Sequence, residues 1–113
     1  MRLDIRKFTE ECITPEYLSW LNDKNHMRFS QQRNRTHTKE SALEYLDTFT
    51  GTPNFFFAIF VDGKMVGTAT AYVEGYAADI GLLIGFPGQG YGSEAWQTII
   101  DLLEARGIKR VTG

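Results

Sequence analysis

Three glycines at alternate positions, Gly88, Gly90 and Gly92, follow an apolar, strand-like stretch and lead directly into a helix-like one. Because glycine has no side chain, this spacing lets the backbone turn sharply and bring its N–H groups close to a bound anion. The first turn of the following helix adds N–H donors without intrahelical partners and the positive end of the helix dipole. The segment therefore predicts a binding site for a phosphate or pyrophosphate group.

Three other interpretations fit this glycine-rich segment less well. A Walker A loop requires a lysine before its Ser or Thr, and Ser93 follows a glycine with no lysine nearby. The run Gly90–Ala95 satisfies the loose dinucleotide fingerprint G-x-G-x-x-A. That fold also needs an acidic residue about 20 positions later and further βα units, and neither follows. A strand-to-helix turn without a ligand would need only one glycine.

The composition is that of one ordered domain with little net charge. The 113 residues are 42% apolar, and 12 basic against 14 acidic side chains give a net charge of −2. This balance gives no general attraction to nucleic acid or to an anionic membrane. The longest apolar run, Phe55–Val61, is much shorter than the ~18 residues of a membrane span, and the N-terminus lacks a signal-peptide pattern. We therefore expect no nucleic-acid partner and no membrane partner.

The cysteine and histidine content bears on location and metal binding. The single cysteine, Cys12, cannot form an internal disulfide, which favours a reducing location such as the cytoplasm. Together with His26 and His37 it lacks the spacing of a metal site, so we predict no metal.

Hydrophobic periodicity and turn residues predict a single α/β domain that spans residues 1–113. Thr14 with Pro15, and Thr38, are expected to cap the first two helices, while Gly107 should end the third. That third helix is predicted to begin at Ser93. The predicted strands are Leu3–Phe8, Phe55–Val61, Lys64–Val73, Ala77–Ile84 and Ile108–Thr112. The order of elements is β-α-α-β-β-β-α-β.

The glycine-rich segment resembles motif A of the GNAT N-acetyltransferases, whose pattern Arg/Gln-x-x-Gly-x-Gly/Ala is similar to the run from Gly88 to Ala95. The predicted element order is also that of the family, so the resemblance covers essentially all 113 residues. It implies a mixed, mostly antiparallel sheet whose fourth and fifth strands are parallel and splay apart. It further implies acetyl-CoA as cosubstrate and a small amine as the acceptor of the acetyl group.

The resemblance also implies which backbone groups hold acetyl-CoA. In the family, N–H groups of this loop bind the pyrophosphate, and the end of the preceding strand hydrogen-bonds the pantetheine arm. The matching positions are Gly88, Gln89, Gly90, Tyr91, Gly92 and Ser93 for the pyrophosphate, and Leu82, Leu83 and Ile84 for the pantetheine. Pro87 stands where the family has Arg or Gln, and the loop after Gly85 is short by several residues. Pyrophosphate binding is therefore expected to rest on N–H groups without the usual side chain.

Acetyl transfer to an amine requires a proton acceptor, because only the neutral amine is nucleophilic. In the family a carboxylate on the fourth strand commonly takes this role, and Asp79 is the matching position. A plain surface aspartate at the start of a strand is the alternative, and Glu74 is a weaker candidate for the same role. An N–H group of the strand segment Leu82–Ile84 is expected to stabilise the tetrahedral oxyanion.

The first predicted helix and the polar stretch after it resemble the same region of acetyltransferases that modify amino sugars. They resemble ribosomal-protein N-terminal acetyltransferases more distantly. The resemblance implies that this region lines the acceptor cleft, where arginine can bind the phosphates of a nucleotide sugar. The candidate acceptor-binding residues are Asn22, Arg28, Arg33 and Arg35, and a solvated basic loop is the alternative. Trp20 is expected to be a core residue rather than a stacking platform.

The family continues past its fifth strand into two further strands, which carry an Asn-containing motif and a tyrosine placed as general acid. Neither is present in this sequence, so we expect a chain truncated after its fifth strand. An exposed last strand would favour pairing with another chain, which makes a homodimer one expectation. A CoA-binding domain without catalytic activity is the alternative class of function.

Overall fold

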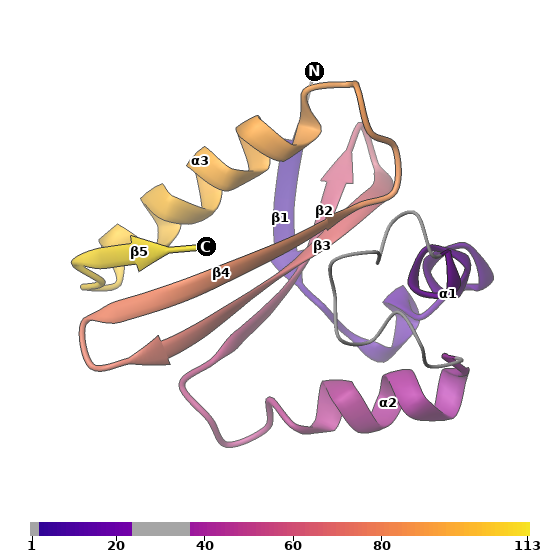
Figure 1. Cartoon of the computed structure of the whole chain (residues 1–113), viewed down its shortest axis with the longest axis horizontal. Helices are drawn as coiled ribbons and strands as arrows, with labels where there is room; N and C mark the ends of the chain where they lie inside the picture. Colours follow the sequence, from indigo (N-terminus) through magenta and orange to yellow (C-terminus); the bar gives the residue numbers. More distant parts are fainter. Residues whose placement is uncertain (1–2, 24–36) are drawn as a thin grey trace.

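The computed structural model describes residues 3–23 and 37–113 of the chain. Helices α1 (Pro15–Asn22), α2 (Lys39–Asp47) and α3 (Tyr91–Ala105) accompany strands β1 (Leu3–Lys7), β2 (Phe55–Val61), β3 (Lys64–Glu74), β4 (Ala77–Ile84) and β5 (Arg110–Thr112). A short 3-10 turn, Glu10–Cys12, precedes α1. The predicted order β-α-α-β-β-β-α-β is confirmed (Figure 1).

The described strands form one sheet in the order β1-β2-β3-β4-β5. Neighbouring strands are antiparallel except β4 and β5, which run parallel, as the family resemblance implied. The turn between β2 and β3 has Asp62 at φ 50° and Gly63 at φ 84°. Two consecutive positive φ values are typical of the tight two-residue turn that suits the right-handed twist of a hairpin.

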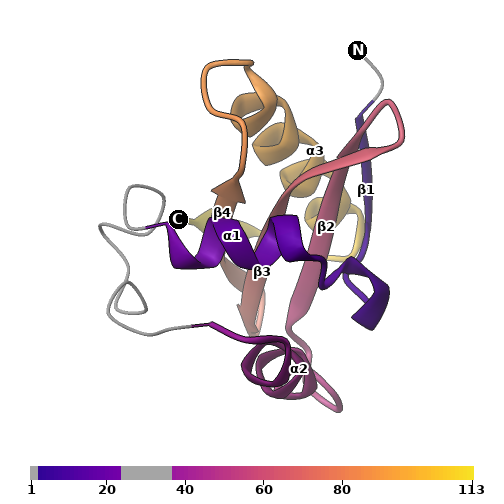
Figure 2. The same ribbon diagram turned by 90° about the vertical axis from the view of Figure 1, so that its right-hand side faces the viewer.

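The sheet lies between two helical layers, and each of its faces forms its own hydrophobic core. On one face, Phe57 and Ile59 of β2 pack with the buried stripe of α3. On the other face, Phe56 and Ala58 pack with α1 and α2. Figure 2 shows this layering, with α1 in front of the sheet and α3 behind it. Strand β2 is buried on both faces, which explains why its residues are all apolar. A strand with one exposed face would instead alternate apolar and polar residues.

Hydrogen bonds confirm the helix caps that the sequence predicts. The Thr14 hydroxyl oxygen accepts from the N–H of Tyr17 at 3.1 Å, with Pro15 at the first helical position. At α2, Thr38 and Ser41 exchange side-chain to backbone hydrogen bonds in both directions, at 3.2 and 2.9 Å. Both helices that cover this face of the sheet therefore begin at positions set by local sequence.

Several element boundaries differ from the prediction: β1 ends at Lys7 rather than Phe8, and β3 ends at Glu74 rather than Val73. Helix α3 begins at Tyr91 rather than Ser93, because Gly90 adopts a left-handed φ of 78° and serves as N-cap without a side chain. Strand β5 begins at Arg110 rather than Ile108. Ile108 is instead buried in the core, and its N–H donates to a carbonyl in the last turn of α3 at 3.1 Å.

Trp20 of α1 lies directly against Gly85, the first residue after β4. A Cβ atom built on Gly85 would lie 2.1 Å from Cε2 of the indole, so no larger residue fits there without displacing the ring. The indole also meets the ring of Phe86 edge-on, with centroids 5.9 Å apart. Trp20 is buried, which confirms the prediction that it is a core residue.

We expect Gly85→Ala to lower the free energy of unfolding by about 1–3 kcal/mol, because the added methyl group forces the indole of Trp20 out of its packed position. Gly81→Ala on β4 is the matched control, since its Cβ would meet only the Thr70 hydroxyl at 3.2 Å. Urea unfolding followed by far-UV circular dichroism measures both variants. Equal stability of the two would show that the contact with Trp20 is not tight.

Candidate functional site

The glycine-rich turn between β4 and α3 has the backbone geometry of an anion site. Gly88 and Gly90 have φ values of 85° and 78°, in the left-handed region that other residues rarely adopt. Gly90 caps α3 without a side-chain hydrogen bond. In the part of the chain that the structure describes, the N–H groups from Gly88 to Ser93 donate to no protein acceptor. They are therefore available to a ligand.

The positive potential at this turn comes mainly from the backbone. No charged side chain lies between Gly85 and Ser93, and Glu94 in the first turn of α3 is acidic. The dipole of the 15-residue helix α3 contributes about half a unit of positive charge at its N-terminus. One cation approaches from another element: Nζ of Lys64, at the start of β3, lies 4.4 Å from the centroid of the Phe86 ring. Sequence reasoning missed Lys64, because nothing local in the sequence relates it to the turn.

The end of β4 leads into the turn and contributes to both cores. Leu82 and Ile84 pack on the side of α3, and Leu83 packs on the side of α1 and α2. Strand β5 pairs with the first three residues of β4. Within the described residues, the outer backbone edge of β4 from Ile80 onward therefore has no strand partner. This edge can offer N–H and C=O groups to an extended ligand.

Asp79 lies near the start of β4, is exposed, and has hydroxyl-bearing residues on both neighbouring strands. The hydroxyl of Thr112 on β5 donates to Oδ1 of Asp79 at 3.1 Å. Tyr72 of β3 is the direct cross-strand neighbour of Asp79, so the two side chains stand on the same face of the sheet. The hydroxyl oxygen of Tyr72 is 2.6 Å from that of Tyr45 on α2. Sequence reasoning singled out Asp79 but missed its neighbours Thr112 and Tyr72, and the contact of Tyr72 with Tyr45.

The Tyr45–Tyr72 pair keeps hydrogen-bonding capacity beside the carboxylate. Burial raises the pKa of Tyr45 above its usual range, and the hydrogen bond to Tyr72 adds to this shift. Tyr45 is therefore neutral at physiological pH. Because one hydroxyl donates to the other, one O–H donor of the pair remains for a further partner.

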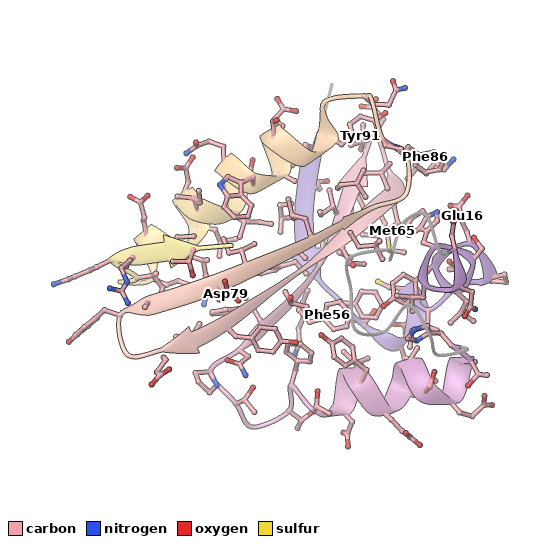
Figure 3. All side chains as sticks on the ribbon, viewed as in Figure 1. Glu16, Phe56, Met65, Asp79, Phe86 and Tyr91 are labelled. Atoms are coloured by element: carbon pink, nitrogen blue, oxygen red, sulfur yellow. The ribbon has the colours of Figure 1, made fainter. Side chains whose placement is uncertain are left out.

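The two ends of β4 thus carry different chemical groups. Figure 3 shows Asp79 toward one end of the strand and Phe86 and Tyr91 beyond the other end. The five steps of β4 from Asp79 to Ile84 correspond to about 17 Å at the usual rise of a strand. A single ligand that reaches both the turn and the carboxylate must therefore have a long, extended arm.

Of the predicted acceptor-binding residues, the structure describes Asn22. The side chain of Asn22 donates to the carbonyl of His37 at 2.9 Å and accepts from the N–H of His37 at 2.7 Å. These two hydrogen bonds tie the end of α1 to the residue before the cap of α2. Arg28, Arg33 and Arg35 lie outside the described residues.

The described residues contain no group of three His, Cys, Asp or Glu side chains able to hold a metal ion. None of their helices is long and apolar enough to cross a lipid bilayer. A cavity of about 740 Å³ lies where β1 ends and β2 begins. Its lining includes Lys7, Phe49, Phe55, Leu102 and Arg106. None of the predicted site residues lines that cavity.

Comparison with known proteins finds a matching family model and several solved structures with a similar fold. A family model described as the acetyltransferase (GNAT) domain matches residues 2–113. No curated protein matches the chain significantly. Among solved structures, an acetyltransferase of the GNAT family from Bacillus anthracis is similar with a TM-score of 0.76 and 22% sequence identity. The match covers 98% of this chain and 68% of that one.

Two further solved structures contain coenzyme A. RimL, a ribosomal α-N-protein acetyltransferase in complex with coenzyme A, has a TM-score of 0.76 at 20% identity, over 93% of this chain and 65% of its own. An aminoglycoside acetyltransferase in complex with coenzyme A and kanamycin has a TM-score of 0.75 at 20% identity. That match covers 92% of this chain and 68% of the other. At these identities the likeness establishes a shared fold.

We expect Gly90→Ala to destabilise the fold by about 1 kcal/mol, because alanine must adopt the left-handed φ of 78° that caps α3. Gly92→Ala is the control, since Gly92 is helical and its Cβ would come no closer than 3.7 Å to another residue, at Ile84. It should be neutral or slightly stabilising. Chemical denaturation of both variants tests this, and a loss of stability in Gly92→Ala as large as that in Gly90→Ala would contradict it.

Proposed function

The chain belongs to the GNAT acetyltransferase family, and from this premise we propose that it transfers an acetyl group from acetyl-CoA to a primary amine. The observation that carries the proposal is the arrangement along β4, with N–H donors in the turn at one end and the Asp79 carboxylate at the other. Acetyl-CoA suits this arrangement because its pyrophosphate and its thioester are joined by the extended pantetheine arm.

Binding of acetyl-CoA would use backbone groups that have no partner within the described protein. The N–H groups proposed for the pyrophosphate are those of Gly88, Gln89, Gly90, Tyr91, Gly92 and Ser93. The strand edge proposed for the pantetheine is that of Leu82, Leu83 and Ile84. Similar structures that contain coenzyme A support this assignment of the ligand.

In the proposed reaction Asp79 takes a proton from the ammonium form of the acceptor, directly or through water. The neutral nitrogen then attacks the thioester carbonyl carbon, and an N–H group of Leu82–Ile84 stabilises the resulting oxyanion. Collapse of this intermediate breaks the C–S bond, and the thiolate leaves with the electron pair. The second proton on the nitrogen is lost to solvent, which gives the neutral amide, and the thiolate takes up a proton from solvent. The exposure of Asp79 and its place beside the unpaired edge of β4 support this role.

The acceptor is proposed to be an amino sugar or a similar hydroxylated amine. The Thr112 hydroxyl that bonds Asp79 and the Tyr45–Tyr72 hydroxyl pair on the same side of the sheet support this, because hydroxyl groups offer donors and acceptors that match those of a sugar. Asn22, Arg28, Arg33 and Arg35 remain proposed acceptor-binding residues. The single thiol, Cys12, supports a reducing location such as the cytoplasm.

Release of free thiol from acetyl-CoA, measured with glucosamine, kanamycin and a peptide with a free N-terminus, tests the proposal. Turnover with either sugar supports the amino-sugar acceptor. Turnover with the peptide alone favours a protein N-terminal acetyltransferase, since RimL is among the similar structures. Binding of acetyl-CoA without any turnover favours the non-catalytic alternative.

We expect Gly92→Val to weaken coenzyme A binding at least tenfold, because the branched side chain would stand between the helix N-terminus and the pyrophosphate. The fold should persist, since Gly92 is helical and has space around it. Thr98→Val introduces the same side chain further along α3 and is the control. Calorimetry with coenzyme A measures affinity, and unchanged binding in Gly92→Val would move the anion site away from this turn.

Asp79→Asn should lower the turnover rate by about 10²–10⁴-fold, because the amide keeps the shape of the carboxylate but cannot accept the proton. Affinity for coenzyme A should change little, since Asp79 lies at the other end of β4 from the turn. Asp101→Asn, on the exposed surface of α3, is the control. Turnover of Asp79→Asn equal to that of this control would end the proposed role.

A further inference from the structure

The proposed coenzyme A site is rich in N–H donors but poor in positive charge. Coenzyme A carries several negative charges on its pyrophosphate and its ribose phosphate. The turn from Gly85 to Ser93 has no charged side chain, and Glu94 adds a negative charge to the first turn of α3. Pro87 can supply neither a charge nor a hydrogen-bond donor. The fractional charge of the helix N-terminus alone is small against that of the ligand.

One described cation stands beside this turn, on a different element. Lys64 is the first residue of β3, and the tight turn formed by Asp62 and Gly63 sets its position. Two residues later, the carbonyl of Val66 accepts a hydrogen bond from the N–H of Gly85 at 2.8 Å. The start of β3 is therefore hydrogen-bonded to the start of the glycine-rich turn. Figure 1 shows the β2–β3 turn and the β4–α3 turn at the same end of the sheet.

The charge of Lys64 is not neutralised by a carboxylate. Its Nζ lies over the ring of Phe86, 4.4 Å from the centroid, and Phe86 is two residues from Gly88. The salt bridge found in the described residues joins Arg6 to Asp4, and Lys64 takes no part in one there. Lys64 is exposed, and a ring contact leaves the N–H donors of the ammonium group free to bind phosphate oxygens.

We propose that Lys64 is a coenzyme A-binding residue that supplies, from the β2–β3 hairpin, the positive charge that Pro87 does not supply from the turn itself. The inference rests on the proposed function, because it assigns Lys64 to the same ligand. The ring of Phe86 holds the flexible lysine stem at the rim of the turn, so the ammonium group is already near the phosphates before they bind. In either case Lys64 would contact a phosphate oxygen, which belongs to the pyrophosphate or to the ribose phosphate.

The test compares Lys64→Gln with Lys109→Gln, a control in an equivalent contact. Nζ of Lys109 lies 5.0 Å from the centroid of the Tyr76 ring, and Tyr76 immediately precedes β4, at the opposite end of that strand from the turn. Affinities of the whole chain for coenzyme A, dephospho-coenzyme A and pantetheine are measured by calorimetry at low and high salt. Lys64→Arg keeps the charge and serves as the conservative variant.

We expect Lys64→Gln to weaken coenzyme A binding about threefold to tenfold at low salt, and less at high salt, because salt screens the lost charge. Lys109→Gln should bind as the wild type does, and Lys64→Arg should bind nearly as well. A loss that persists with dephospho-coenzyme A assigns the contact to the pyrophosphate, and a loss confined to coenzyme A assigns it to the ribose phosphate.

Two results would overturn the inference while the proposed function stands. One is that Lys64→Gln and Lys109→Gln both bind coenzyme A with the affinity of the wild type. The other is an equal loss for pantetheine, which has no pyrophosphate, since that would give Lys64 a structural role only. A wild-type chain that binds no coenzyme A would overturn the proposed function and the inference together.

Discussion

The position of the glycine-rich turn depends on the contact between the indole of Trp20 and the backbone of Gly85. The ring can approach the chain this closely only because Gly85 has no Cβ atom. The contact continues through a series of aromatic rings: the Phe8–Tyr17, Tyr17–Trp20 and Trp20–Phe86 centroids are 5.1, 6.3 and 5.9 Å apart. Helix α1 and the glycine-rich turn therefore belong to one packed unit.

Strand β4 fixes the distance between the two halves of the candidate site. Its pairing with β3 along its whole length sets Asp79 opposite Tyr72 and brings Ile84 level with Gly67. Because a strand has a nearly constant rise per residue, neither half can approach the other without breaking this ladder. Thr112 of β5 bonds Asp79, and Tyr72 of β3, its cross-strand neighbour, bonds Tyr45 of α2, so this half of the candidate site depends on α2, β3 and β5 together.

Much of the fold could be predicted because its signals are local. Thr14 and Thr38 cap helices through bonds to residues three positions away, and Gly107 has the left-handed φ of 97° expected after a helix. The start of α3 was predicted two residues too late, because Gly90 caps it through backbone conformation rather than a recognisable side chain. The spacing of the glycines pointed to the turn, and the family resemblance pointed to Asp79; the roles of both are proposals.

The parts of the site that could not be predicted involve contacts between residues distant in the sequence. The hydroxyls of Tyr45 and Tyr72 meet across 27 positions, and Lys64 reaches Phe86 only because two hairpin-linked strands bring their turns together. The hydrogen bonds of Asn22 with His37 also depend on a separation of 15 residues. No periodicity or motif in one sequence reports such pairs.

The Asn22–His37 pair has a consequence for how proteins of this design can diversify. Through these two hydrogen bonds, the side chain of Asn22 joins the end of α1 directly to the residue before the cap of α2. Doubling the length of a loop between fixed ends costs only about 0.6 kcal/mol. Chains that keep this pair can therefore differ in length between the two residues at a small cost in the free energy of folding.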